Sequence, residues 1–193
     1  MKKFPIVLDL ETKHTFREFN DPKKLGVTVV AIYDYKNSQG KVFAENELNK
    51  LYLILEAASY IIGFNVRSFD LAVLQGYYPG KTDQLPTFDI LDDIKEKIGR
   101  RLALNDILFA TLGKKKTGHG LMAIDYYKEG KIDKLKQYCL DDVMLTKEIF
   151  EYGAEHGEIN YLDPAGKATI KVDWKKYLEG SGKNTSTHLT LPF

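Results

Sequence analysis

The chain has 193 residues, enough for one domain of ordinary size, and its 44% hydrophobic and 28% charged residues are typical of a protein that folds by itself. Its 28 basic and 27 acidic residues give a net charge of +1, which argues against tight non-specific coating of DNA but leaves room for a local basic groove. The single cysteine, Cys139, excludes an internal disulfide, and charges interrupt the first apolar run too early for a signal peptide or a membrane span, so we expect a cytoplasmic protein with no membrane partner.

Strand patterns dominate the first part of the chain. The apolar run from Phe4 to Leu10 predicts a buried strand, and residues 27–35 (VTVVAIYDY) are rich in the β-branched and aromatic side chains that favour strands. Turn residues then precede another short strand over residues 41–44, so we expect a meander. A helix over about residues 46–58 and a strand at residues 60–64 follow.

Helical patterns dominate the remainder. We expect helices over residues 68–77, 91–98, 104–112, 121–127 and 132–152. Residues 88–91 fit either a short strand or the entry to a helix. After Glu158, two strand-like runs flank the turn residues Asp163 to Gly166, which is a hairpin signature, and the last dozen residues are expected to be flexible.

This order of elements predicts an α/β domain with a mixed β-sheet and helices packed against it. We place the domain at residues 1–157. We assign residues 158–193 to a C-terminal β-hairpin appendage with a flexible tail.

Asp9 and Glu11 stand at the C-terminal end of the first predicted strand. Because side chains alternate along a strand, both carboxylates project to the same side. Two carboxylates at the edge of a buried strand repel each other and lose solvation, which a hard divalent cation would compensate. The alternative is that both acids lie in the first solvated residues after the strand, where Glu11 or Thr12 caps the next element.

Asp70 ends the segment IGFNVRSFD, in which a predicted strand and a polar turn lead into a helix. Acids near strand ends of α/β domains tend to point into the crevice where ligands bind. The alternative is that Asp70 only complements the positive end of the helix dipole. The same electrostatic role is our interpretation of Asp89, Asp92 and Asp93.

Tyr138 and Asp142 lie four residues apart in the longest predicted helix, so they share a face and reach the same pocket. Asp142 lies on the flank of the apolar Cys139 and Val143, where a free acid is poorly tolerated. A function therefore explains Asp142 better than a surface position does. Asp141 is rotated by about 100° and is interpreted as a solvated surface acid.

These motifs, DLE at residues 9–11, NVRSFD at residues 65–70 and YCLDD at residues 138–142, resemble the three motifs of the DEDD exonuclease superfamily, in the same order and on the same kinds of element. The tyrosine of the third motif resembles the tyrosine subclass, which includes the proofreading exonuclease domains of DNA polymerases. The segments LGKKKTGHGLMAIDYY and GEINYLDPAGKATIKVDW also resemble a stand-alone predicted exonuclease family that is sometimes associated with helicases.

The resemblance implies a ribonuclease-H-like fold and a 3′–5′ exonuclease that hydrolyses phosphodiester bonds at the 3′ end of single-stranded DNA or RNA by a two-metal-ion mechanism. It implies that two divalent cations, Mg²⁺ or Mn²⁺, are held by Asp9, Glu11, Asp70 and Asp142. Asp9 would bridge both cations, Asp70 would serve the second one, and Tyr138 would orient the attacking water.

By the same resemblance, we expect Leu10 and Thr12 to touch the terminal nucleotide, and we add Asn65, Phe69 and Lys115 as further candidate substrate-binding residues. Phe69 is a candidate for stacking on a base, with a core role as the alternative. Lys115 belongs to a run of lysines at residues 114–116 that either meets the phosphate backbone or is a solvated loop. His119 is not expected to be catalytic, because no second histidine or cysteine stands at a zinc spacing.

Two other functions fit the same pattern. One is a catalytically silent nuclease-fold module that binds nucleic acid and acts with a partner such as a helicase, and the other is an endonuclease of the ribonuclease H type. The intact acids argue against the first, and the pairing of Tyr138 with Asp142 favours the exonuclease over the second.

Overall fold

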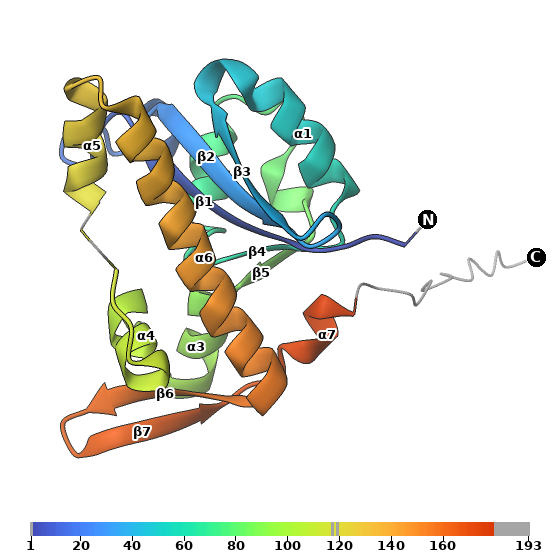
Figure 1. Ribbon diagram of the computed structural model, residues 1–193, viewed down its shortest axis with the longest axis vertical. Coiled ribbons are helices and arrows are strands. Elements are labelled where there is room, and N and C mark those ends of the chain that lie inside the picture. Colours follow the sequence, from blue (N-terminus) through green and yellow to red (C-terminus); the bar gives the residue numbers. More distant parts are fainter. Residues whose placement is uncertain (1, 117, 119, 180–193) are drawn as a thin grey trace, which may run out of the picture.

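The computed structural model describes residues 2–116, 118 and 120–179, and its centre is a sheet with the strand order β3-β2-β1-β4-β5 (Figure 1). The strands are β1 (Ile6–Thr12), β2 (Val27–Asp34), β3 (Gln39–Ala44), β4 (Ile61–Gly63) and β5 (Thr87–Asp89). β1, β2 and β3 pair antiparallel, whereas β4 pairs parallel with both β1 and β5. The sheet is therefore mixed, which confirms the predicted α/β class.

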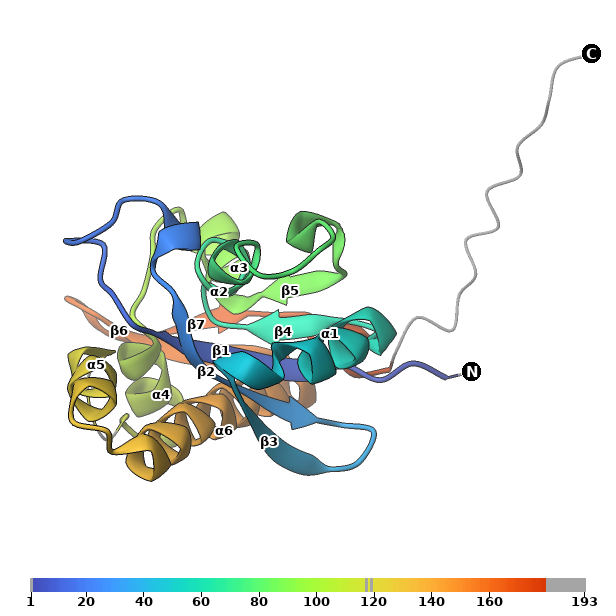
Figure 2. The same cartoon turned by 90° about the horizontal axis from the view of Figure 1, so that it is seen from above.

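The alternation of side chains along β1 divides the interior into two cores. Ile6, Leu8 and Leu10 pack on the side of α1 (Leu48–Ala57), while Val7 packs on the side of α6 (Ile132–His156). Helix α6 crosses the sheet diagonally in Figure 1 and covers one of its faces, as the view from above also shows (Figure 2). The odd-numbered positions of β1 therefore face α6.

Shorter helices complete the layers around the sheet. They are α2 (Asp70–Leu74), α3 (Ile90–Ile98), α4 (Leu104–Leu112), α5 (Gly120–Lys128) and α7 (Lys175–Leu178), with 3₁₀ turns η1 (Pro22–Lys24), η2 (Glu45–Glu47) and η3 (Thr82–Gln84). Among the described residues, no helix combines the length and the apolar character that crossing a lipid bilayer requires.

Several predicted boundaries differ from the structure: β1 begins and ends two residues later than predicted, and α6 continues to His156. Helix α2 is shorter than the predicted helix over residues 68–77, and a left-handed Asn65, with a φ of 66°, redirects the chain before Asp70. For residues 88–91, both alternatives that the sequence left open are present. β5 ends at Asp89, and α3 begins at the next residue. The Asp89 carboxylate caps this helix by accepting from the Leu91 N–H at 3.0 Å.

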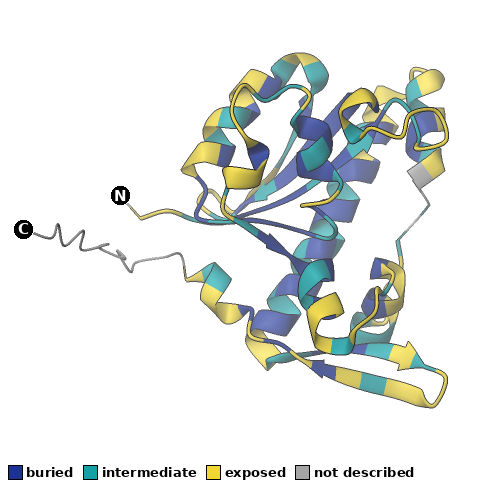
Figure 3. Ribbon diagram, turned by 180° about the vertical axis from the view of Figure 1, so that it is seen from behind, coloured by how far each residue is buried: buried dark blue, intermediate teal, exposed yellow. Residues whose placement is uncertain are grey.

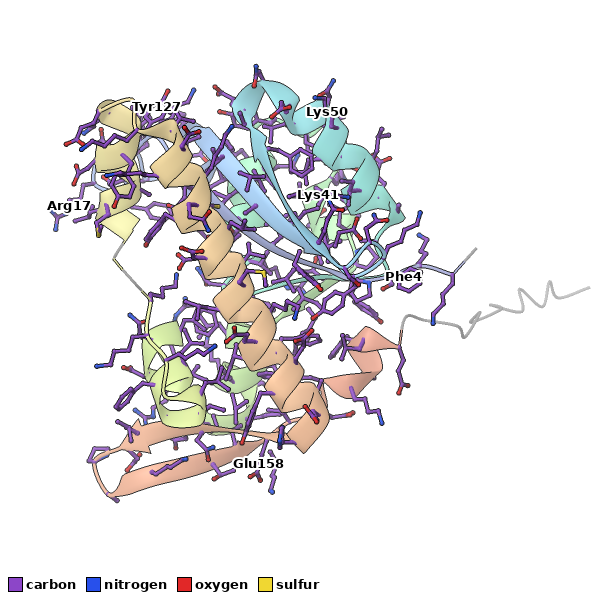
Figure 4. All side chains as sticks on the ribbon, in the orientation of Figure 1. Phe4, Arg17, Lys41, Lys50, Tyr127 and Glu158 are labelled. Atoms are coloured by element: carbon purple, nitrogen blue, oxygen red, sulfur yellow. The ribbon has the colours of Figure 1, made fainter. Side chains whose placement is uncertain are left out.

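The C-terminal hairpin is present as β6 (Glu158–Asp163) and β7 (Gly166–Lys171), and its tip is exposed (Figure 3). It starts, at Glu158, at the end of the molecule opposite Lys50 of α1 (Figure 4). The chain then returns to the core through Trp174, which is only 1% exposed and stacks on Phe150 of α6 with ring centroids 6.0 Å apart. The flexible tail predicted for the last dozen residues lies outside the described part of the chain.

Candidate active site

The first two acids of the site come from the end of β1. Asp9 and Glu11 occupy odd-numbered positions, so both side chains point toward α6 and both are partly buried. The pairing of β1 with β2 becomes irregular between Glu11 and Thr12, where the Thr28 hydroxyl donates to the Glu11 carbonyl at 2.9 Å. A bulge of this kind disrupts the ladder locally beside the carboxylates and bends the strand, as is common next to active sites.

Helix α6 supplies the facing wall. Asp142 is 4% exposed and Tyr138 is 6% exposed, and Cys139 between them packs its thiol against the Asp9 carbonyl, with Sγ 3.5 Å from the oxygen. Carboxylate oxygens of Asp9, Glu11 and Asp142 all lie within 4.8 Å of one another. The structure thus brings together acids that are more than a hundred residues apart in the chain.

Asp70 lies beside this group rather than in it. It is buried at the first residue of α2, and its Oδ1 accepts the Leu10 N–H at 2.9 Å. Burial raises the pKa of Asp70 well above its usual range, and the negative charge of Asp9 raises this pKa further. Asp70 is therefore close enough to Asp9 to interact with its charge, while one of its oxygens is committed to the backbone of β1.

The carboxylates of the site lack sufficient compensating charge. Burial, opposed by Lys116 and reinforced by Asp142, raises the pKa of Asp9 to about 7. Burial together with Asp9 and Asp142 raises the pKa of Glu11 to about 9, and burial also raises the pKa of Asp142. Clustered carboxylates that resist ionisation are a fitting ligand set for a hard divalent cation, which would restore their charged forms.

Lys116 is the lysine that reaches these acids, whereas Lys115 is the one singled out from the sequence as a substrate contact. Its Nζ lies 2.7 Å from Asp142 Oδ2. Burial lowers the pKa of Lys116, but the charges of Asp9 and Asp142 outweigh this effect and raise it. Lys115 instead places its Nζ 4.6 Å from the centre of the Phe109 ring.

The acids open into a cavity of about 500 Å³, a volume in the range of small-ligand sites. Its walls include the expected Leu10, Thr12 and Phe69, with Leu10 and Thr12 largely buried. Phe16 also lines the cavity, although no sequence pattern distinguishes it; this residue is 49% exposed, and its ring centroid lies 5.8 Å from that of Phe69. Its exposure at the edge of a cavity that holds carboxylates marks Phe16 as a candidate for ligand contact.

Asn65 has a different position from the one expected. It does not line this cavity; its N–H donates to Asp89 Oδ1 at 2.9 Å, and its side-chain oxygen accepts from Arg101 at 2.8 Å. The structure thus places Asn65 in the turn that connects β4 to α2. His119 lies outside the described residues.

Comparisons with known proteins identify the class. A family model described as the RNase_H superfamily matches residues 6–153, and the chain therefore belongs to this superfamily. Together with the cluster of acids, membership supports a nuclease that uses divalent metal and acts on nucleic acid.

The comparison with solved structures supports the same fold. A family B DNA polymerase from the hyperthermophilic archaeon Pyrobaculum calidifontis superposes with a TM-score of 0.57 at 13% identity, over 79% of this chain and 25% of the polymerase chain. This chain thus spans about a quarter of that polymerase, and the likeness concerns the fold. No curated protein matches the chain.

Proposed function

We propose that the protein is a metal-dependent 3′–5′ exonuclease that trims the single-stranded 3′ end of DNA or RNA. The observation that carries the proposal is the convergence of Asp142 with Asp9 and Glu11 within 4.8 Å, with Tyr138 on the same cavity one helical turn away. The likeness to the tyrosine subclass of DEDD exonucleases supports end-trimming over internal cleavage.

The donor set determines which residues would hold the metal. Asp9, Glu11 and Asp142 would hold one Mg²⁺ or Mn²⁺ ion, and Asp70 would serve a second ion beside Asp9. Bound divalent cations stabilise charge on phosphate oxygens and promote the ionisation of water. The bond between Asp70 and the Leu10 N–H fixes the carboxylate of Asp70 relative to β1, and so relative to Asp9.

Tyr138 orients the attacking water rather than removing its proton. Burial and the nearby Asp142 and Glu11 carboxylates raise the pKa of Tyr138 well above 10, its ordinary value. The phenol therefore keeps its proton at neutral pH and serves as a hydrogen-bonding group in the cavity.

The aromatic wall of the cavity suits a nucleobase. Phe16 and Phe69 form a tilted pair at its border, and flat apolar rings of this kind stack on bases of any sequence. Leu10 and Thr12 line the same cavity, in which the terminal nucleotide would lie.

The test is hydrolysis of single-stranded DNA and RNA carrying a label at the 5′ end, in Mg²⁺ and in Mn²⁺. We expect a ladder of products that shorten from the 3′ end, release of mononucleotides, and no cleavage of a circular strand. Cleavage of the circle would favour an endonuclease, and binding without hydrolysis would favour a silent module.

The matched variants are Asp142→Asn and Asp141→Asn, one residue apart on α6. Asp141 accepts a hydrogen bond from Gln137 and is not one of the converging acids, so its loss should leave the rate within about tenfold of wild type. Loss of Asp142 removes a proposed metal ligand, and we expect a decrease of about 1000-fold or more. Equal rates for the two variants would contradict the assignment of Asp142.

A further inference from the structure

Three consecutive lysines precede α5, and each has a different partner. Lys114 forms an ion pair with Glu148, Lys115 lies over the Phe109 ring, and Lys116 forms an ion pair with Asp142. Lys116 alone among them lines the cavity that holds the carboxylates. A substitution of Lys115 is therefore a matched control for the same substitution of Lys116.

Lys116 is held at both ends. Its backbone N–H donates to the Asn105 side chain of α4 at 2.8 Å, and its Nζ contacts Asp142 of α6 at 2.7 Å. The side chain of Lys116 is 22% exposed and that of Asp142 is 5% exposed. An ammonium group that is anchored in this way, and mostly withdrawn from water, is unlike the solvated end of a surface lysine.

The position of this charge has two consequences. A cation that binds Asp142 meets a positive charge already in contact with the same carboxylate, so Lys116 opposes metal binding. When metal neutralises the acids, the Lys116 ammonium remains as positive charge next to the cavity, where it can attract the singly charged phosphodiester of a strand.

We propose that Lys116 is a phosphate-binding residue of this active site that also lowers the affinity of Asp142 for divalent metal. This inference rests on the proposed nuclease function and extends it by assigning a residue that contacts the substrate. It assigns opposite signs to two measurable effects of removing the charge: metal should bind more tightly, and nucleic acid more weakly.

The experiment uses Lys116→Met, which removes the charge and keeps the length, Lys116→Arg, which keeps the charge, and Lys115→Met as the control. Mn²⁺ binding is measured by titration calorimetry without substrate. We expect Lys116→Met to bind Mn²⁺ about tenfold more tightly, because repulsion between a single and a double positive charge is removed. Lys116→Arg and Lys115→Met should match wild type within about threefold.

Binding of a fluorescently labelled single-stranded oligonucleotide is then measured by anisotropy in saturating Ca²⁺ across a salt series. We expect Lys116→Met to bind the oligonucleotide about five- to tenfold more weakly. The slope of the logarithm of affinity against the logarithm of salt concentration should decrease in magnitude by about one, as the loss of one phosphate contact predicts. The Lys115→Met control should keep the wild-type slope.

Unchanged or weaker Mn²⁺ binding by Lys116→Met would overturn the proposal, because a lysine that only braces the loop can lose affinity but not gain it. An unchanged oligonucleotide affinity and salt slope would equally overturn it. Circular dichroism checks folding, and Lys116→Gln replaces Lys116→Met if that variant is unfolded. Neither the Mn²⁺ titration nor the anisotropy measurement needs hydrolysis. The exonuclease assignment can therefore fail in the ladder assay while the Lys116 assignment holds, and the Lys116 assignment can fail while the exonuclease assignment holds.

Discussion

Asp9→Asn should make the protein more stable while it removes a proposed metal ligand. Folding raises the pKa of Asp9 from its ordinary value of 3.8 to about 7. At a pH above about 7, Asp9 is therefore ionised in both states, and its buried charge destabilises the folded state. A shift of about three units corresponds to about 4 kcal/mol at most. Because Asp9 is partly exposed, solvent screening reduces this value, and we expect a gain of about 1–3 kcal/mol at pH 8 without divalent metal.

The sign of the pH dependence follows from the raised pKa. The folded state holds the Asp9 proton more tightly than the unfolded state, so the cost is absent below about pH 4, grows as the pH rises, and is complete above about pH 7. The stability gain of Asp9→Asn should therefore shrink as the pH falls from 8 to 4. The exposed Asp83 provides the control, since Asp83→Asn should change stability little at either pH.

Scanning calorimetry in EDTA measures this effect. A gain of about 1–3 kcal/mol corresponds to a rise in Tm of roughly 3–10 °C for a chain of this size. Mn²⁺ should raise the Tm of wild type at pH 8 and raise that of Asp9→Asn much less, because a ligand that binds the folded state stabilises it. A lower Tm for Asp9→Asn at pH 8, with normal secondary structure, would refute the idea that the site is an uncompensated group of acids.

Two further changes test other parts of the structure. Tyr138→Phe should lower kcat by roughly 10–100-fold and leave the Kd for Mn²⁺ unchanged, because the phenol orients water and is not a metal ligand; steady-state rates and calorimetry measure the two quantities. A weaker Mn²⁺ affinity would contradict this role. Trp174→Ala should destabilise the fold by about 3–5 kcal/mol, since the indole is buried against Phe150. Denaturant titration measures this loss, and the exposed Leu162→Ala should cost less than about 0.5 kcal/mol.

Local periodicity predicted the parts of the site that lie within one element. Alternation along a strand is enough to align Asp9 with Glu11, and helical spacing is enough to align Tyr138 with Asp142. The β-branched composition of β2 and the turn before β3 predicted their antiparallel pairing for the same reason. These features depend on neighbours in sequence, which a single sequence displays directly.

The features that the sequence did not predict depend on contacts between distant elements. The sequence does not distinguish the three lysines at residues 114–116. In the structure, the Lys116 backbone N–H donates to Asn105 of α4, and the Lys116 Nζ contacts Asp142 of α6. The hydrogen bond that ties Asp70 to Leu10 spans 60 residues and has no local pattern. Phe16 lies in a segment without regular structure before β2, so no periodicity distinguishes it.

The domain boundary at residue 157 stays a prediction. The hairpin and α7 follow this point, yet Trp174 packs into the core with Phe88 and Phe150, and its indole N–H donates to Asp93 at 2.8 Å. Sequence patterns mark where an element ends but do not show whether the next segment returns to the same core.

Helix α6 carries Asp142 near its middle and Gly153 near its end, on one uninterrupted run of backbone. Gly153 must remain glycine because a Cβ there would lie 2.3 Å from the Trp174 ring. A single inserted or deleted residue between the two positions would rotate one relative to the other by about 100°. Homologous chains that keep both features should therefore differ in length only outside this stretch, whereas substitutions on the outer side of the helix are free to accumulate.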